Sequence, residues 1–357
     1  MKTSLEVEYW VIDDAGDLVA PGPLLDTSAQ IDPEFVEPML EIKTTPCSSM
    51  VELREEFVDR IGNAVDAARD QNKRLVPLAT PLHASPAEIP YREKTSTDLQ
   101  RQIIGRSFDD ARVCAGTHIH FEQSNVVDQL NTLTALDPAF ALVTSSSHYR
   151  GERILECARP FLYRRSCYEH CPEQGQLWPY VDSVAEWERR LEDAYEGFRE
   201  RAITRGVDPA AFDDAFDPYD AVWTPVRLRK AMPTVEWRSP DAALPSQILQ
   251  LTEAVRSIVT HADARGTVVG DADSYAGEVT LPEFDTVESV TDAAIYDGLE
   301  SPAVTTYLDE LGFTPSAYDP LATRLPDSHL SKRQAKQLRL EASKRLEADL
   351  KRHRVRA

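Results

Sequence analysis

Positive charge is scarce in this sequence. Its 357 residues contain 60 aspartates and glutamates but only 39 lysines and arginines, so the formal net charge is −21. This balance argues against nucleic acid or an anionic membrane as a partner of the body of the protein, because both repel a negative surface. Only nine of the 39 are lysines. The bias resembles that of cytoplasmic proteins from salt-accumulating halophiles, whose internal salt screens self-repulsion.

Cysteine is also sparse. The five cysteines are Cys47, Cys114, Cys157, Cys167 and Cys171. They are odd in number and few for the length, and no secretory signal precedes the first strand-like run, so we expect reduced thiols and a cytoplasmic location. Cys167, Cys171 and the intervening His170 have the chemistry to hold a metal, but one pair without a second is more typical of structural thiols.

Long apolar runs and the common nucleotide and zinc motifs are missing. No stretch approaches the roughly 18 apolar residues of a membrane span. The sequence contains no internal repeat, no glycine-rich phosphate loop, no CxxC pair and no HExxH motif. These absences exclude a membrane-spanning helix, a P-loop nucleotide site and the most familiar zinc sites.

What the sequence does contain is charge inside strand-like runs. Between Phe35 and Thr44, after Pro38, apolar residues alternate with Glu41 and Lys43. Period-two alternation places these two charges on one face of a strand. A charged side chain in a strand that otherwise looks buried is unfavourable unless it has a partner or a ligand.

Three further runs share this pattern. They are Ser4 to Val11 with Glu6 and Glu8, Cys114 to Phe121 with His118 and His120, and Pro233 to Ser239 with Glu236 and Arg238. If the four runs share a sheet, their polar faces coincide and their ligand-type side chains converge. Carboxylate oxygens with an occasional imidazole suit hard divalent cations such as magnesium or manganese, and magnesium usually comes with substrate phosphates. The pattern predicts a metal and phosphate site on a sheet face.

Other interpretations exist for each run taken alone. A charged face of period two is more often the solvated side of an antiparallel sheet. His118 and His120 also have the spacing of a zinc ligand pair, although no other zinc motif accompanies them. Four such runs in one chain favour the magnesium interpretation.

Helical patterns surround the strands. A capping box at Ser49 and Glu52 opens a long helix. Further helices are expected over 126–136, 187–206 and 248–259, a strand over 75–80, a loop with a short helix over 84–112, a surface excursion over 208–219, and short helices at best over 270–320. We expect one catalytic domain over residues 1–330 and a basic helical tail over 331–357 that folds back on the acidic body.

An arginine-rich stretch lies in loop-like sequence between these elements. It contains Arg159, Arg164 and Arg165. These guanidinium groups have the geometry to clamp a carboxylate or a phosphate, and they are equally compatible with solvated surface charge. Both interpretations remain open at this point.

From about residue 4 to about residue 260, the chain resembles the glutamate-cysteine ligase family of carboxylate-amine ligases, of the bacterial and archaeal kind. The order and spacing of four motifs carry the resemblance: LEVEYW with Glu6 and Glu8, EFVEPMLEIKT over 34–44, CAGTHIHF with His118, and TVEWR with Glu236 and Arg238. The resemblance implies an α+β fold, a curved and mainly antiparallel sheet flanked by helices, related to the catalytic domain of glutamine synthetase. Ser4 and Leu5 stand where the family commonly has Gly-Val, and the last 100 residues or so carry no matching motif.

The resemblance also implies a reaction. ATP would phosphorylate the side-chain carboxylate of glutamate, and the amine of cysteine would displace the phosphate. Magnesium, with manganese as an alternative, and arginines would offset the repulsion between the two anions. By position, one metal group would comprise Glu6 and Glu236, and another Glu8, Glu34, Glu41 and His118. The implied catalytic residues are Glu41, Glu236 and Arg238, and the implied substrate-binding residues are His120 and Arg164, the latter following Leu162 where the family has Ser.

The same metal cluster would serve a ligase with a different amine acceptor. A non-catalytic member that binds nucleotide or metal is a second alternative. The expected partners are therefore small molecules, namely ATP, glutamate, and cysteine or another amine, while assembly into a homo-oligomer is left open.

Overall fold

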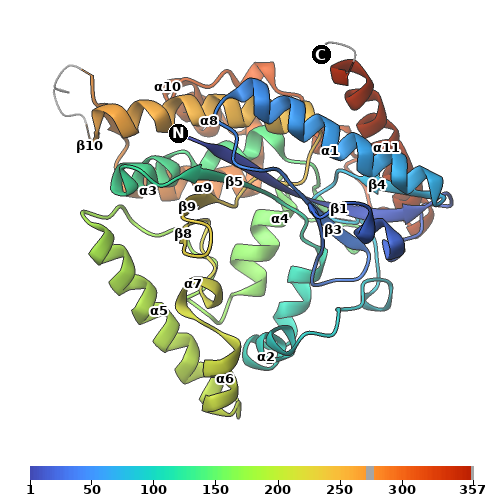
Figure 1. Cartoon of the computed structure of the whole chain (residues 1–357), viewed down its shortest axis with the longest axis horizontal. Coiled ribbons are helices and arrows are strands. Elements are labelled where there is room, and N and C mark those ends of the chain that lie inside the picture. The colour runs from blue at the N-terminus through green and yellow to red at the C-terminus, as the bar shows by residue number, and fades with distance from the viewer. Residues whose placement is uncertain (271–276, 355–357) are drawn as a thin grey trace.

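A seven-stranded sheet forms the centre of the protein (Figure 1). A computed structural model describes residues 1–270 and 277–354. The strands follow the order β2-β3-β1-β5-β9-β8, with β4 paired to the far end of β1, and each of these pairings is antiparallel. Their bounds are β1 Thr3–Asp13, β2 Ile31–Pro33, β3 Met39–Lys43, β4 Lys73–Val76, β5 Thr117–Glu122, β8 Val226–Arg229 and β9 Thr234–Trp237. The expected α+β fold with a mainly antiparallel sheet is confirmed.

One face of the sheet is apolar and is covered by two long helices. Helix α1 (Met50–Asp70) and helix α8 (Pro245–Arg265) lie side by side across this face in Figure 1. The capping box of α1 forms as expected, since Ser49 accepts from the Glu52 N–H and the Glu52 carboxylate accepts from the Ser49 N–H. Phe57 and other α1 side chains are fully buried, and each such side chain stabilises the fold by about 1.5 to 3 kcal/mol.

The basic C-terminal segment is helix α11 (Lys332–Arg354), which packs against α1, α8 and β4. Arg339 anchors it, because its buried guanidinium donates to the carbonyls of Gly16, Pro81 and His83. A buried guanidinium without such acceptors would be costly. The tail therefore folds back on the body, and its last residues, 355–357, lie outside the described residues.

The opposite face of the sheet is polar and is covered by one long helix, α5, and several short ones. They are α2 (Thr95–Ile104), α4 (Ala158–Phe161) with the π-helix Leu162–Cys167, α5 (Val184–Thr204), α6 (Pro209–Ala215) and α7 (Pro218–Ala221). In Figure 1 these elements lie on the other side of the sheet from α1 and α8. The segment 208–219, expected as a surface excursion, forms α6 and the start of α7; most of its residues are exposed, while Phe212 and Phe216 are buried and Phe212 packs against Tyr195 of α5.

The remaining elements close the ends of the sheet. They are α3 (Val126–Ala135), α9 (Phe284–Asp297), α10 (Pro302–Glu310), and the short pairs β6 (His148–Tyr149) with β7 (Glu152–Arg153) and β10 (Thr267–Val269) with β11 (Val279–Leu281). The helices expected at 126–136, 187–206 and 248–259 are confirmed as α3, α5 and α8. The expectation of short helices over 270–320 is wrong for α9, whose 14 residues bury an apolar stripe, and residues 271–276 lie outside the described part. Of the described helices, none has the length and apolar character that crossing a bilayer requires.

Candidate functional site

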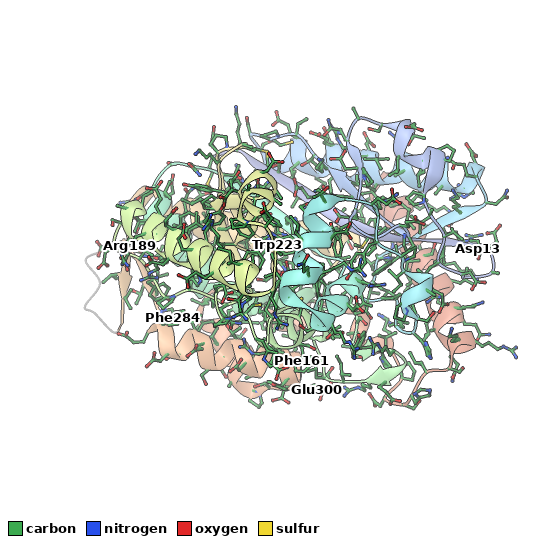
Figure 2. All side chains as sticks on the ribbon, turned by 90° about the horizontal axis from the view of Figure 1, so that it is seen from below. Asp13, Phe161, Arg189, Trp223, Phe284 and Glu300 are labelled. Atoms are coloured by element: carbon green, nitrogen blue, oxygen red, sulfur yellow. The ribbon has the colours of Figure 1, made fainter. Side chains whose placement is uncertain are left out.

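The polar face of the sheet forms one wall of a cleft of about 750 Å³. Strands β1, β3, β5 and β8 supply this wall, and α2, the π-helix and the α6–α7 segment supply the other. Figure 2 shows Trp223, which lines the cleft, between the yellow-green helices and the cyan α2. Acidic and basic side chains both line the cleft, and a space of this size is typical of a small-molecule site.

The strand register brings the expected ligands together. Glu8 pairs with Glu41 across β1 and β3, and Glu6 pairs with His118 across β1 and β5. His120 pairs with Glu236 across β5 and β9. Residues directly opposite each other in antiparallel strands share a face with Cβ atoms about 5 Å apart. Because β1 is central, its two glutamates reach neighbours on both sides.

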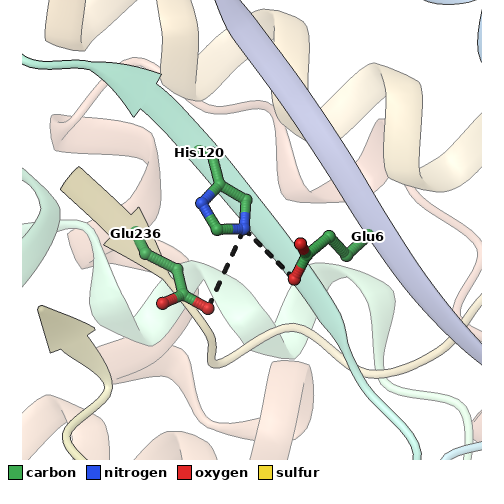
Figure 3. Close-up of side chains that lie close together, drawn as sticks. All are labelled: Glu6, His120 and Glu236. Atoms are coloured by element: carbon green, nitrogen blue, oxygen red, sulfur yellow. Dashed lines mark ion pairs between the residues drawn. The ribbon is translucent and has the colours of Figure 1, made fainter. Parts of the chain in front are cut away.

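These side chains form three linked groups, each able to offer a cation three ligand atoms within 4.8 Å of one another. The first triad is Glu6, His120 and Glu236, the second is Glu6, Glu41 and His118, and the third is Glu8, Glu34 and Glu41. Figure 3 shows the first triad, with the His120 ring between the two carboxylates. Glu6 and Glu41 are each shared by two triads, so the three groups form one continuous cluster.

His120 is oriented for a cation. Its Nδ1 lies 3.0 Å from the Thr234 hydroxyl, and that hydroxyl donates to the Met232 carbonyl at 3.1 Å. The hydroxyl oxygen therefore accepts from Nδ1–H, which leaves Nε2 with a lone pair. Among the described residues this buried Nε2 has no hydrogen-bond partner, and it lies 3.3 Å from Glu6 Oε2 and 3.9 Å from Glu236 Oε1. In the neutral ring its lone pair faces two carboxylates, an arrangement that either a proton on Nε2 or a metal ion would stabilise.

The basic half of the cluster consists of Glu236, Arg227 and Arg238. Arg227 Nε donates to Glu236 Oε2 at 2.6 Å, and Arg238 donates to Oε1 of the same carboxylate. Burial alone would raise the pKa of Glu236, but Arg227 and Arg238 more than offset it and hold that pKa well below its usual value. The carboxylate is thus ionised without any metal.

The acidic half of the cluster consists of Glu8, Glu34 and Glu41. Lys43 is the nearest side-chain cation to Glu41, at 3.8 Å from Oε2, and the Gly116 N–H donates to Glu8 at 2.6 Å. Burial, together with the charge of Glu8, raises the pKa of Glu34 to about 8. Burial, with Glu6 and Glu34 nearby, likewise holds the pKa of Glu41 well above its usual value. Glu34 and Glu41 therefore bind protons more tightly than free carboxyl groups do, and a metal ion would compete with those protons.

The imidazole of His118 bridges the two halves. Its Nδ1 lies 3.2 Å from Glu6 Oε2 and 3.5 Å from Glu236 Oε1, and its Nε2 lies 3.9 Å from Glu8 Oε1. Burial and the nearby Arg238 lower the pKa of His118. For Glu6, burial opposes ionisation, but the two imidazoles outweigh it and lower the pKa of this carboxyl.

The donor set fits magnesium. The third triad offers only carboxylate oxygens, and each of the other two offers two carboxylates and one imidazole. Magnesium accepts oxygen ligands and retains waters or substrate phosphates, so three protein ligands are sufficient. The imidazoles also admit manganese. The His120 nitrogen without a partner and the raised pKa values of Glu34 and Glu41 both fit the same interpretation.

The structure groups these residues differently from the expectation. Sequence reasoning paired Glu6 with Glu236 and assigned His120 to substrate binding, whereas His120 lies with both carboxylates in the first triad. Glu6 and Glu41 also meet at His118, which links the two expected metal groups. The ligand and catalytic roles of these residues remain predictions.

Arg164 lies apart from the cluster. Its guanidinium donates to both oxygens of the buried Asp137, at 2.6 and 3.1 Å, and to the Ser239 hydroxyl at 2.6 Å. Trp237 also donates to Asp137. Arg164 does not line the 750 Å³ cleft, and its expected role in substrate binding stays a prediction.

Two cleft residues had no role assigned from the sequence. Arg227 lies opposite Glu236 across β8 and β9, and the alternation in Val226–Arg229 was the signal that could have identified it. Lys43 lies on the polar face of β3 beside Glu41 and is also ion-paired with Asp32. Both supply positive charge at the edge of the carboxylate cluster.

The cysteines are buried free thiols. His170, between Cys167 and Cys171, is exposed. Burial raises the pKa of Cys171 to about 11, which disfavours the thiolate form that metals require. This agrees with the structural interpretation of the pair.

This chain matches a known protein family and several of its curated members. The profile described as "Glutamate-cysteine ligase family 2 (GCS2)" matches residues 8–303. A relative named "Putative glutamate--cysteine ligase 2" from Jannaschia sp. (strain CCS1) is 24% identical over 253 residues, which are 67% of this chain and 60% of the relative. A relative of the same name from Salinispora arenicola (strain CNS-205) is 28% identical over 217 residues, 60% of this chain and 51% of the relative. The matched region thus spans about half to three-fifths of these curated relatives.

Two solved structures share the fold. A bifunctional glutathione synthetase from Pasteurella multocida has a TM-score of 0.58 at 14% identity, over 97% of this chain and 52% of that chain. A glutamate-cysteine ligase from Francisella tularensis, in complex with AMP, has a TM-score of 0.59 at 13% identity, over 98% of this chain and 88% of that chain. At these identities the likeness establishes the fold alone. The family profile covers most of the chain, including every residue of the carboxylate cluster except Glu6, and this chain belongs to glutamate-cysteine ligase family 2.

Proposed function

We propose that this protein is an ATP-dependent ligase that joins the side-chain carboxylate of glutamate to the amine of cysteine through a γ-glutamyl phosphate, releasing ADP. The observation that carries the proposal is the set of three linked carboxylate and histidine triads beside Arg227 and Arg238 in one cleft. A cleft of about 750 Å³ is large enough for a nucleotide and an amino acid together.

The reaction needs this distribution of charge. A carboxylate is a poor electrophile, and its phosphorylation brings two anions together. Magnesium held by the triads would neutralise the phosphates and the charge that develops in the transition state. The first triad would hold one ion, and the second and third triads, through Glu41 and His118, would hold others.

The chain's own residues position the ligands and the phosphoryl group. Thr234 fixes the ring of His120, and the Gly116 N–H fixes the Glu8 carboxylate, since bound partners of this kind orient metal ligands. Arg238 extends along the cleft wall with its pKa held above the usual value, despite burial, by Glu236. A permanently charged guanidinium there would steady the transferring phosphoryl group.

The names of the relatives support the choice of substrates. Relatives of this chain carry the name glutamate--cysteine ligase 2, marked as putative, and the structural neighbour from Francisella tularensis was solved with AMP. Glutamate is therefore the proposed donor, ATP the phosphoryl source and cysteine the acceptor. Another amine remains the alternative, because the metal cluster does not distinguish between acceptors.

The test is a substrate screen. The purified protein is incubated in high salt with ATP, magnesium and glutamate, the twenty amino acids and common amines are added one at a time, and ADP release is followed with mass detection of the adduct. We expect γ-glutamylcysteine well above all other adducts. The Glu41→Gln variant, purified in the same way, controls for a contaminating ATPase.

Each other outcome changes the proposal in a defined way. Adduct formation with a different amine would retain the ligase and replace the acceptor. Release of AMP and pyrophosphate would exclude the acyl-phosphate route. No product with any amine would favour a protein that binds nucleotide and metal without catalysis.

A further inference from the structure

Lys43 ends β3 on the face that carries the carboxylate cluster. It follows Glu41 by two residues, so period-two geometry places both side chains on one face, and it stands directly opposite Glu6 across β1 and β3. Its ammonium lies 3.8 Å from Glu41 Oε2, and its side chain lines the main cleft. Lys43 therefore adjoins the two carboxylates that are each shared by two triads.

Asp32 holds the ammonium at the edge of the cluster. It lies on β2, opposite Glu41 in the strand register, and its carboxylate accepts a hydrogen bond from Lys43. Two carboxylates opposite each other in a sheet repel, and the ammonium beside both offsets this repulsion. The side chains of Lys43 and Asp32 are 29% and 46% exposed, and an ion pair this exposed contributes little to stability. Stability alone is thus a weak reason for a lysine at this point of the cleft.

A metal ion in the second triad would change the surroundings of this ammonium. The triad consists of Glu6, Glu41 and His118, and both of its carboxylates adjoin Lys43. With the triad filled, the two carboxylates would be neutralised, and the ion and the ammonium would repel each other. A phosphate group bound to the ion would supply the missing anion, since magnesium usually retains substrate phosphates as ligands. A lysine ammonium binds phosphate as a compact point charge.

We propose that Lys43 binds a phosphate group of the nucleotide, and that Asp32 holds its ammonium in place before the nucleotide enters. The inference rests on the proposed function for the identity of the nucleotide and deepens it by assigning a phosphate ligand beside the acidic half. Arg238 contacts Glu236 in the basic half, so each half offers the phosphates a basic side chain. Through Lys43, magnesium and nucleotide in the acidic half each bind more tightly when the other is present.

Binding without turnover tests this assignment. The native protein, Lys43→Met, Lys43→Arg and Asp32→Asn are titrated in a calorimeter with magnesium alone. They are then titrated, at saturating magnesium, with the ATP analogue that has a non-hydrolysable imido bridge between its β and γ phosphates. Lys336→Met is the matched control, because Lys336 forms an ion pair of similar exposure with Asp17, and neither residue lines the cleft.

The variants of Lys43 should differ from the control. We expect Lys43→Met to bind the analogue about 10- to 100-fold more weakly and magnesium alone more tightly, because one positive charge is lost beside both ligands. Lys43→Arg retains the charge and should lose much less affinity for the analogue, and Lys336→Met should bind as the native protein does. Inorganic triphosphate should lose as much affinity as the analogue in Lys43→Met, because the contact is with phosphate and not with the nucleoside.

The Asp32→Asn variant separates a phosphate ligand from a structural ion pair. Lys43→Met and Asp32→Asn both break the pair, so a purely structural role would make their effects on analogue binding alike. If Lys43 binds phosphate, Asp32→Asn frees its ammonium and should leave the affinity for the analogue unchanged or higher. Equal weakening by the two variants would overturn the proposal.

Unchanged affinity of Lys43→Met for the analogue would also overturn it, even if magnesium alone bound more tightly. In the active enzyme, Lys43→Met should raise the KM of ATP and leave the KM of glutamate unchanged, and an increase confined to the KM of glutamate would contradict the assignment. A protein that binds the analogue through Lys43 but never releases ADP would disprove the proposed reaction and retain Lys43 as a phosphate ligand.

Discussion

The two halves of the carboxylate cluster contain similar potential ligands, but the side chains around them differ in charge. In the basic half, the buried Arg227 and the partly buried Arg238 contact Glu236 directly, and the pKa of Glu236 lies well below the usual value. In the acidic half, Glu8, Glu34 and Glu41 lie together. Lys43 lies 3.8 Å from Glu41 and the charge of Arg238 acts on Glu34, but burial and the neighbouring carboxylates outweigh them, so the pKa values of Glu34 and Glu41 are raised. The basic half is balanced by direct ion pairs with arginine, whereas the acidic half is only partly balanced by the chain itself.

This difference identifies where a cation is required. A buried carboxylate with an arginine partner is compatible with a purely structural ion pair. A group of carboxylates with too little positive charge beside it is unfavourable in the fold unless protons or metal ions join it. The acidic half is therefore the stronger indication of metal binding, and the basic half is where the anionic phosphate can be received.

Removing one ligand from the acidic half should have the largest effect on turnover. Glu41 belongs to two triads, so we expect Glu41→Gln to lower kcat by about a thousandfold, the scale found when a preorganised electrostatic group is lost. Glu253→Gln, at an exposed ion pair with Arg54, is the control and should retain native activity. A Glu41→Gln enzyme with most of its rate would mean that the triads do not hold the catalytic metals.

The same substitution should affect stability differently in the two halves. Glu236→Gln leaves Arg227 and Arg238 buried without their carboxylate, which we expect to cost about 3 to 5 kcal/mol in the free energy of unfolding. Glu41→Gln replaces a carboxyl group that the metal-free protein tends to keep protonated, and should leave stability almost unchanged without metal. Urea unfolding in EDTA measures the free energy of unfolding of both variants. Equal destabilisation by the two changes would mean that the two halves do not differ in their counter-charges.

Magnesium should stabilise the protein through the acidic half. At a magnesium concentration one hundred times Kd, linkage predicts about 2.7 kcal/mol of stabilisation per site. The increment should be smaller in Glu34→Gln and Glu41→Gln than in Glu253→Gln. Thermal unfolding with and without EDTA provides the measurement, and an increment that both cleft variants retain in full would place the metal elsewhere.

Metal binding should also release protons. The pKa of Glu34 is raised from 4.5 to about 8 without metal, so the folded protein holds this proton more tightly than the unfolded chain. The metal-free protein should therefore lose stability as pH rises from about 4.5 to about 8, and magnesium affinity should increase over the same range. Calorimetric titrations in buffers of different ionisation enthalpy count the protons, and a count of zero at pH 7 would contradict the raised pKa.

The faces of the strands could be predicted from the sequence, but their order could not. Period-two alternation placed Glu6, Glu8 and Glu41 on polar faces, because the side-chain period of a strand is fixed by its backbone. The central position of β1, between β3 and β5, is set by long-range pairing that alternation does not encode. That position explains why Glu6 takes part in two triads instead of the one expected.

The arginines illustrate the same limit. Arg159 and Arg164 are five residues apart, and residues at this spacing lie on different sides of a helix. The α4 helix and the π-helix that follows it direct Arg159 to the cleft and Arg164 to the buried Asp137. The sequence suggested a loop for this segment, and a loop does not indicate which of the two arginines faces the cleft.

The smallest expected effect concerns the surface and not the cleft. With a net charge of −21, self-repulsion destabilises the compact state, and salt near 1 M shortens the Debye length to about 3 Å. We expect molar potassium chloride to add on the order of 1 kcal/mol, or roughly 1 to 2 °C in Tm for a chain of this size. Because screening acts on the surface, potassium chloride should raise the Tm of Glu41→Gln as much as that of the native protein, whereas magnesium should raise it less. A Tm that stays flat or falls with salt would contradict the halophilic interpretation, and a gain lost in Glu41→Gln would mean that potassium acts within the acidic half.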